Sequence, residues 1–181
     1  MNNEVKIVVG SWYAYNNCNA KALGSEWICL NDFEDWEEIE AELTKQGFVL
    51  DGEDEELFIQ DIECEADFRF NGDYMHPKTL FELLKESEVL DDEYKFKTCK
   101  AYIEVCGWGD FVNLIESRGS RWDDDIVFYE NQSLEDVAYE IVNECYDLPE
   151  IAQRYFDYEA FARDLSYDGF SEVEDGVIEI R

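Results

Sequence analysis

The pattern of apolar and polar positions divides the 181-residue chain into short strands and amphipathic helices. Runs rich in β-branched and aromatic residues predict three strands in the first third of the chain, at residues 4–15, 22–30 and 56–64. After the second strand, apolar residues recur at helical spacing up to about Gln46, with Asn31 or Asp32 as the cap and Gly47 as the stop. We therefore expect a small α+β unit, with the acidic segment 51–56 as a solvated hairpin or linker.

The middle of the chain has helical periodicity punctuated by glycines at 107, 109 and 119. Three helices are predicted there, at about residues 78–88, 91–106 and 109–117. His76 stands directly before Pro77, and we expect it to cap a helix or lie in a loop rather than to act as a catalytic base.

The C-terminal residues return to a mixture of strands and helices. We predict a strand at 126–130, helices at 134–146, from Pro149 and from Asp157 to Leu165, and a hairpin at 171–181. Ser133 followed by Asp136 is typical of a helix cap, and Asp175–Gly176 is typical of a hairpin turn. The C-terminal part is therefore expected to hold a short sheet and about three helices.

The fold class that follows is α+β, with a small N-terminal unit of three strands plus a helix, a helical middle and a mixed C-terminal unit. We place the domains at 1–67, 68–122 and 123–181. The hydrophobic content of 46% and the aromatic content of 15% are enough for a packed core.

The chain contains no recognisable targeting segment and no cysteine motif. No stretch resembles a signal peptide or could span a membrane, so we expect a soluble, cytoplasmic protein. The six cysteines are scattered without a C-x-x-C pair, and the chain has one histidine. This argues against zinc and favours free, mostly buried thiols.

Net charge is the strongest signal, because 46 acids against 14 bases give −32. The acids lie in two blocks: residues 32–67 and 123–181 each carry −15, whereas 1–31 is neutral and 68–122 carries −2. The near-neutral middle contains Lys95, Lys97 and Lys100. Such a protein repels nucleic acid and anionic membranes and attracts basic partners. Adaptation to high salt would acidify the surface more evenly, so the blocks favour a specific role.

Two predicted helices carry carboxylate rows at four-residue spacing opposite an apolar face, which is the expected core side. Glu34, Glu38 and Glu42 form one row, and Asp136, Glu140 and Glu144 form the other. Like charges at this spacing cost a few tenths of a kcal/mol per pair. Four residues of helix rise about 6 Å, so a row can match roughly every second phosphate of a DNA strand at about 3.4 Å each. The alternative is an ordinary solvated helix face.

The candidate phosphate-mimic surface includes the neighbouring acids as well. It comprises Glu34, Asp35, Glu37, Glu38, Glu42, Asp123, Asp124, Asp125, Glu135, Asp136, Glu140 and Glu144.

Other chemistries have weaker support in the residues. Neither the segment 51–56 nor Asp123–Asp125 fits the EF-hand pattern, although calcium binding at the surface stays open as an alternative. Among 46 acids, spacing cannot single out a glycosidase pair. No nucleotide-binding or nucleophile-elbow motif is present. We therefore expect no enzyme activity, no catalytic residues, no cofactor and no metal.

The chain resembles the ArdA family of antirestriction proteins in three stretches. LEDVAYEIVNEC at 134–145 looks like the family's antirestriction motif, and LPEIAQRYFDYEAFARDL at 148–165 resembles its most recognisable segment. At the front, the first strand, the G-x-x-W at Gly24–Trp27 and the DFEDWEEIEAEL helix are similar to the N-terminal domain. The closing hairpin also fits, so the likeness covers about residues 5–65 and 125–181.

The resemblance implies an elongated, three-domain protein, borne on plasmids, conjugative transposons or phages, that pairs as a homodimer through its C-terminal region. It implies an acidic surface shaped like bent DNA that occupies the groove of Type I restriction–modification enzymes, chiefly at the methyltransferase core. The near-neutral middle departs from this pattern. The residues of the antirestriction motif and the expected core or dimer seam are Leu134, Val137, Ala138, Tyr139, Ile141, Tyr155, Phe156, Tyr158 and Phe161.

The leading hypothesis is therefore inhibition of a Type I enzyme by DNA mimicry without catalysis, with no nucleic acid and no membrane as partners. A mimic or chaperone for another basic or DNA-binding protein, such as a CRISPR nuclease, is the alternative. A metal-binding acidic protein is the third.

Overall fold

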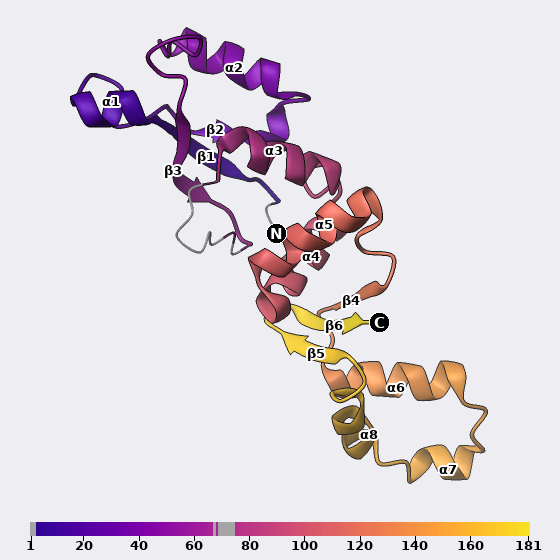
Figure 1. Cartoon of the computed structure of the whole chain (residues 1–181). Helices are drawn as coiled ribbons and strands as arrows, with labels where there is room; N and C mark the ends of the chain where they lie inside the picture. The colour runs from indigo at the N-terminus through magenta and orange to yellow at the C-terminus, as the bar shows by residue number, and fades with distance from the viewer. Residues whose placement is uncertain (1–2, 67, 69–74) are drawn as a thin grey trace.

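The computed structural model describes residues 3–66, 68 and 75–181. Over these residues the chain forms eight α-helices and two three-stranded antiparallel sheets. The molecule is extended in one direction, with the first sheet at one end, α6–α8 at the other, and α3–α5 between them (Figure 1). This confirms the α+β class. It also confirms the predicted order along the chain: an N-terminal part with a sheet, a helical middle and a C-terminal part with strands and helices.

The first sheet has the order β2–β1–β3, with β1 in the centre. Its elements are β1 (Lys6–Ser11), α1 (Trp12–Asn17), β2 (Ile28–Cys29), α2 (Trp36–Lys45) and β3 (Leu57–Glu63). All of β1 except Lys6 is buried, as expected for a central strand. Trp36, Ile39 and Leu43 of α2 join the same core, which confirms the apolar face expected of this helix.

The first predicted strand, 4–15, is too long at its C-terminal end. The chain turns into α1 at Trp12 because Ser11 caps this helix, its Oγ accepting a hydrogen bond from the Ala14 amide. The Ser11 hydroxyl in turn donates to the buried Asp54 carboxylate at 2.7 Å. A side chain brought in from 43 residues away thus overrides the local β preference.

The second predicted strand, 22–30, is shortened to two residues, Ile28 and Cys29. Ser25 replaces regular pairing with β1, because its amide donates to the Val9 carbonyl and its hydroxyl oxygen accepts from the Val9 amide. Gly24 just before it has a φ of +83°, which is incompatible with a continuous strand.

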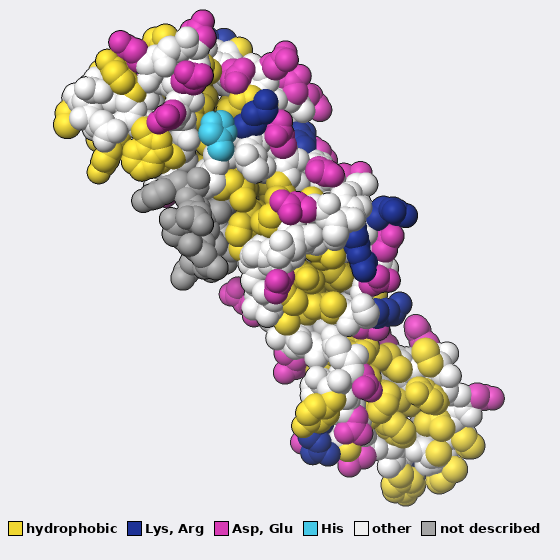
Figure 2. Space-filling view, viewed as in Figure 1, with side chains coloured by type: hydrophobic (Ala, Val, Ile, Leu, Met, Phe, Trp, Pro, Cys, Tyr) yellow, Lys and Arg dark blue, Asp and Glu magenta, His cyan; other side chains and the backbone are white. Residues whose placement is uncertain are grey.

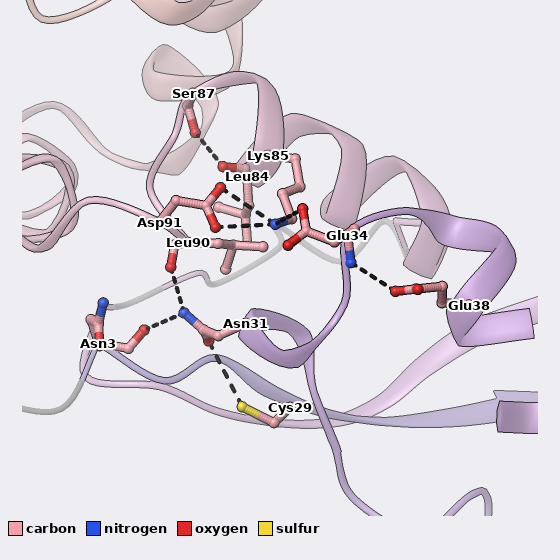
Figure 3. A network of polar contacts seen from close by, with 10 residues as sticks. All are labelled: Asn3, Cys29, Asn31, Glu34, Glu38, Leu84, Lys85, Ser87, Leu90 and Asp91. Atoms are coloured by element: carbon pink, nitrogen blue, oxygen red, sulfur yellow. Dashed lines mark hydrogen bonds and ion pairs between the residues drawn. The ribbon is translucent and has the colours of Figure 1, made fainter.

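Helix α2 begins later than the sequence indicated. Asn31 and Asp32 lie in a short 3-10 helix, and Asp35 is the N-cap, its carboxylate accepting from the Glu38 amide at 3.0 Å. Asn31 instead links distant segments: its Oδ1 accepts from the Val5 amide, and its Nδ2 donates to the Leu90 and Asn3 carbonyls (Figure 3). The Asn31 side chain therefore connects distant segments instead of capping a helix.

The three predicted middle helices are confirmed. They are α3 (Pro77–Glu86), α4 (Glu93–Cys106) and α5 (Trp108–Arg118). His76 is the N-cap of α3, with Nδ1 accepting from the Lys78 amide, as expected of a capping residue. Partial burial and then the Lys78 charge lower the pKa of this imidazole.

The C-terminal elements also match the prediction closely. They are β4 (Ile126–Glu130), α6 (Leu134–Cys145), α7 (Glu150–Arg154), α8 (Tyr158–Leu165), β5 (Phe170–Val173) and β6 (Gly176–Ile180). The hairpin turn is displaced by one residue, because Gly176 pairs with Val173 and the turn is Glu174–Asp175. A Cβ at Gly176 would lie 2.1 Å from the Tyr129 carbonyl oxygen, so this position of β6 requires glycine.

Strand β6 is the centre of the second sheet, β4–β6–β5, and connects two hydrophobic cores. Successive side chains of a strand point to opposite faces. Ile178 accordingly joins the main core, which runs from the first sheet through α2–α5 to β4, whereas Val177 joins a smaller core with α6 and α8. The main core thus continues across residue 122, and the three-domain division drawn from the sequence stays a prediction.

Trp122 precedes the second sheet in the chain and packs into the helical middle. It is fully buried, its indole N–H donates to the Ser87 carbonyl at 3.0 Å, and its ring meets Phe111 edge to face.

Trp122→Phe removes this donor and leaves both a void and an unsatisfied carbonyl. We expect it to lower the free energy of unfolding by about 2–4 kcal/mol. Chemical denaturation followed by circular dichroism measures the loss. Trp27→Phe is the matched control because Trp27 is 47% exposed, and it should change stability by less than about 0.5 kcal/mol. Equal losses in the two variants would contradict this role of Trp122.

Candidate functional site

The acids around α2 form the first part of the candidate surface, but they do not form one helical row. Glu34 precedes the helix, and its amide donates to the Glu38 carboxylate at 2.9 Å. Asp35 caps the helix, and Glu37 lies exposed in the first turn, where carboxylates interact favourably with the helix dipole. The expected row of Glu34, Glu38 and Glu42 is therefore wrong at its first member.

Glu42 has a cationic neighbour on its own helix. Lys45 lies 3.0 Å from its carboxylate, and Gln46 also donates to it. The hydrogen bond from Lys45 is the main cause that lowers the pKa of Glu42. Of the α2 acids, Glu37 and Glu38 thus contribute most directly to an uncompensated surface.

The α6 acids keep the expected row. Ser133 and Asp136 form a capping box, and this hydrogen bonding lowers the pKa of Asp136. Glu140 accepts from the Gln132 side chain at 3.1 Å, and Glu144 is exposed one turn further on. Asp136, Glu140 and Glu144 all lie within a regular helix, so their spacing is the one predicted, and Glu135 lies exposed in the first turn.

The triplet Asp123–Asp125 lies where the helical middle meets the second sheet, and it is partly paired. Asp123 lies 3.5 Å from Lys95, and Asp125 lies 2.7 Å from Arg118. Asp124 is exposed. Only part of this triplet is therefore available to a partner.

Each of the three lysines of α4 pairs with at least one carboxylate outside this helix. Lys95 binds Glu88 and Asp123, Lys97 binds Glu93 and Glu130, and Lys100 binds Glu174 and Asp175. The lysine side chains are only 14–16% exposed. These bases therefore connect α4 to the C-terminal sheet instead of forming an exposed basic patch. The i,i+4 spacing of Glu93 and Lys97 was visible in the sequence, whereas the long-range partners were not.

A similar ion pair connects α3 to the front of the molecule. Lys85 lies 3.1 Å from Asp91 and 4.0 Å from Glu34, next to the Asn31 hydrogen bonds (Figure 3). One base thus ties the acidic segment before α2 to the helical middle.

The residues of the antirestriction motif divide into buried and exposed sets. Val137 and Ala138 are buried, and Leu134, Ile141 and Phe161 pack against the same small core. Phe156 and Tyr158 lie half-buried in contact with each other, and Tyr158 also contacts Tyr139. Tyr139 is 56% exposed and Tyr155 is 79% exposed, so these two are the members available to a second molecule.

The cysteines are free, but the expectation that most are buried is wrong. Only Cys99 is fully buried, and Cys18 and Cys145 are exposed. Burial raises the pKa of Cys64 to about 11. Over the described ranges, no group of three or more histidine, cysteine or acidic side chains is placed to hold a metal ion. Within the same residues, no helix combines the length and the hydropathy needed to cross a membrane.

Comparison with protein families assigns the chain to a class. A family model described as antirestriction protein (ArdA) matches residues 7–179, nearly the whole chain. The protein belongs to the ArdA family of antirestriction proteins. A comparison with curated protein sequences found no match.

The ion pairs of α4 predict an unusual titration. The hydrogen bonds that Lys97 donates, first to Glu130 and then to Glu93, raise its pKa to about 12. The stability that this pairing adds is complete below the ordinary lysine value of 10.5 and is lost as the pH rises through about 12.

Carbon-detected NMR of the lysine ε-methylene groups measures this pKa directly. Glu130→Gln should move it back toward 10.5, whereas Glu116→Gln, on α5, should leave it unchanged. A Lys97 that titrates at the ordinary value in the unmodified protein would refute the pairing.

Proposed function

We propose that this protein mimics DNA, occupies the DNA-binding groove of a Type I restriction–modification enzyme at its methyltransferase core, and inhibits it without catalysing a reaction. The observation that carries the proposal is the division of charges. The lysines of α4 bind carboxylates of the chain itself, whereas acids such as Glu37, Glu135 and Glu144 face the solvent. Because such an enzyme works on intracellular DNA, the proposal places the protein in the cytoplasm.

The scale of the charge supports a substitute for DNA. Duplex DNA carries one charge per about 1.7 Å, so 32 net negative charges correspond to roughly 54 Å of duplex. The extended shape of the chain spreads these charges along one axis, and acids lie over its whole length in the face that Figure 2 shows. A basic groove that accepts a DNA segment would accept such a surface by charge complementarity.

The regular row on α6 supports a match to phosphates. Its members are a helical turn apart, about 6 Å, which is close to twice the spacing of phosphates along one strand. Binding of this kind is distributed, so single substitutions should have small effects and the complex should weaken with added salt.

We further propose that two copies pair through the C-terminal end. Hydrophobic side chains form a broad patch over α6–α8 (Figure 2). In and directly after α6 and α7, the exposed large hydrophobic side chains are Tyr139, Tyr146, Ile151 and Tyr155, which are 56, 51, 65 and 79% exposed. Contiguous apolar surface of this kind is typical of an interface, and a dimer would double the length of the acidic surface.

The function is tested by titrating the purified protein into Type I enzymes of several families. Methylation and cleavage should both decrease, and excess duplex DNA should restore both. If none of the enzymes is affected by an excess of the protein, the Type I target is wrong. Inhibition of a CRISPR nuclease instead would support the alternative partner.

The exposed acids of α6 predict a collective effect, and Asp136 is left intact because it caps the helix. Glu135→Gln/Glu140→Gln/Glu144→Gln should weaken inhibition roughly threefold to a hundredfold, because exposed charges each contribute little and add up. Dose–response curves at constant ionic strength give the change. The control is Glu86→Gln/Glu116→Gln/Asp168→Asn, which removes the same charge from exposed positions outside the candidate surface. An equal loss in the control would show that total charge, and not the position of these α6 acids, determines binding.

The apolar patch predicts a change of oligomeric state. Ile151→Glu/Tyr155→Glu should convert the dimer to a monomer in sedimentation velocity experiments, since both side chains are exposed in the single chain and a buried carboxylate would be costly. Leu23→Glu is the control, because Leu23 is 85% exposed at the other end of the molecule. A dimer that survives the double substitution would exclude this face.

A further inference from the structure

The turn between α3 and α4, residues 87–92, joins the two ends of the molecule. Helix α3 contacts α2 and β3, whereas α4 contacts β4, β5 and β6. Each of these helices thus packs against one of the two sheets, and Figure 1 shows them between the first sheet and the second. The contacts of this α3–α4 turn therefore bear on how the first sheet is oriented relative to the second.

The α3–α4 turn is bound to the first sheet by the side chain of Asn31. Its Nδ2 donates to the Leu90 carbonyl at 2.7 Å and to the Asn3 carbonyl at 3.3 Å, and its Oδ1 accepts from the Val5 amide at 2.9 Å (Figure 3). Val5 directly precedes Lys6, the first residue of β1, the central strand of the sheet. One side-chain amide therefore bonds the start of the central strand and the α3–α4 turn at the same time.

Lys85, in the last turn of α3, adds an ion pair across the same junction. Its Nζ lies 3.1 Å from the Asp91 carboxylate in the α3–α4 turn and 4.0 Å from the Glu34 carboxylate, and its side chain is only 17% exposed. Glu34 lies just before α2, whose acids form the first part of the candidate surface. The segment that leads into this acidic helix is therefore bound to the α3–α4 turn as well.

The other side of the α3–α4 turn is bound to the segment before the second sheet. The Ser87 carbonyl accepts from the Trp122 indole at 3.0 Å. Lys95 donates to the Glu88 carboxylate at 2.8 Å and to the Ser120 carbonyl at 2.7 Å. Glu88 has a φ of +60°, a conformation that glycine usually adopts after a helix. The strained position thus carries a side chain that bonds to Lys95, as expected where surrounding contacts determine the backbone.

The main hydrophobic core is continuous across this junction, but apolar contacts are non-directional. They constrain the angle between packed elements less than hydrogen bonds do, because hydrogen bonds have preferred distances and angles. We infer that Asn31, assisted by Lys85, is a positioning residue for the acidic surface. Through the α3–α4 turn it fixes the orientation of the acids around α2 relative to the acids of α6.

This inference rests on the proposed function. The acids around α2 and those of α6 lie toward opposite ends of the molecule (Figure 1). Two binding surfaces on one chain reinforce each other only if the geometry lets both engage at once, and ordering them before binding lowers the cost of association. Asn31 therefore strengthens inhibition without any contact with the partner.

Asn31→Asp is the variant that tests this role. It keeps the oxygen that accepts from Val5 and removes the N–H group that donates to Leu90. The matched control is Asn19→Asp, which makes the same change at an exposed loop residue whose Oδ1 accepts from the Lys21 amide.

Residual dipolar couplings of the backbone amides in the full-length protein give an alignment tensor for each sheet. The two sheets should share one tensor in the unmodified protein and in Asn19→Asp. In Asn31→Asp, the couplings within each sheet should still fit that sheet, whereas the two tensors should differ. A loss of stability alone would leave the tensors equal.

Inhibition provides the second measurement. At constant ionic strength, Asn31→Asp should inhibit a Type I enzyme about threefold to thirtyfold less well than Asn19→Asp, because the two acidic surfaces no longer engage together. One common tensor in Asn31→Asp, or inhibition equal to that of Asn19→Asp, would overturn the inference.

Lys85→Gln gives the same comparison if Asn31→Asp does not fold. Its control is Lys78→Gln, since Lys78 pairs with Glu82 within α3. The tensors should differ in Lys85→Gln and stay equal in Lys78→Gln. Equal tensors in both lysine variants would overturn the inference.

The two measurements separate this inference from the proposed function. If the unmodified protein inhibits and Asn31→Asp inhibits equally well, Asn31 has no positioning role in inhibition and the proposed function stands. If the tensors differ in Asn31→Asp but the unmodified protein inhibits no enzyme, the proposed function fails while the role of Asn31 in orienting the two sheets stands.

Discussion

Ion pairing between the lysines of α4 and carboxylates in and next to the C-terminal sheet offsets charge repulsion inside a chain that carries a net charge of −32. Lys95 pairs with Asp123, which precedes β4, and Lys97 pairs with Glu130, the last residue of β4. Lys100 pairs with Asp175, in the turn between β5 and β6. Excess charge of one sign destabilises a compact state through self-repulsion. The α4 lysines reduce this repulsion where the helical middle meets the second sheet. Many acids that they do not pair with stay on the solvent-exposed surface.

Several acids also stabilise the fold. Asp35 and Asp136 cap helices, Glu38 binds the amide of Glu34, and Asp54 fixes the loop beside α1. A carboxylate at the start of a helix stabilises it through the dipole and the free amides. The acidic blocks therefore combine local stability with a negative exterior, which is how a chain this acidic keeps a regular fold.

The sequence predicted the order and type of nearly all elements, because their signals are local. The capping pair Ser133 and Asp136 and the periodicity of α3–α5 required no partner from elsewhere in the chain. The wrongly predicted element boundaries lie where hydrogen bonds from distant residues determine the local structure. Asp54 holds Ser11, which caps α1 at the end of the first strand. Ser25 delays the start of the second strand, and Asn31 links Val5 and Leu90. For the same reason the α6 row could be anticipated, whereas the pairing of the α4 lysines with distant carboxylates could not.

Membership of the ArdA family and the distribution of charge lead to one physical account, in which a folded acidic surface takes the place of DNA in a basic groove. The most direct test is displacement of a fluorescent DNA duplex from a purified Type I methyltransferase core, titrated with this protein at several salt concentrations. The account predicts complete displacement without a ternary complex, and an apparent affinity that falls as salt is added. A complex that holds the enzyme, the duplex and this protein together, or an affinity that does not change with salt, would contradict it.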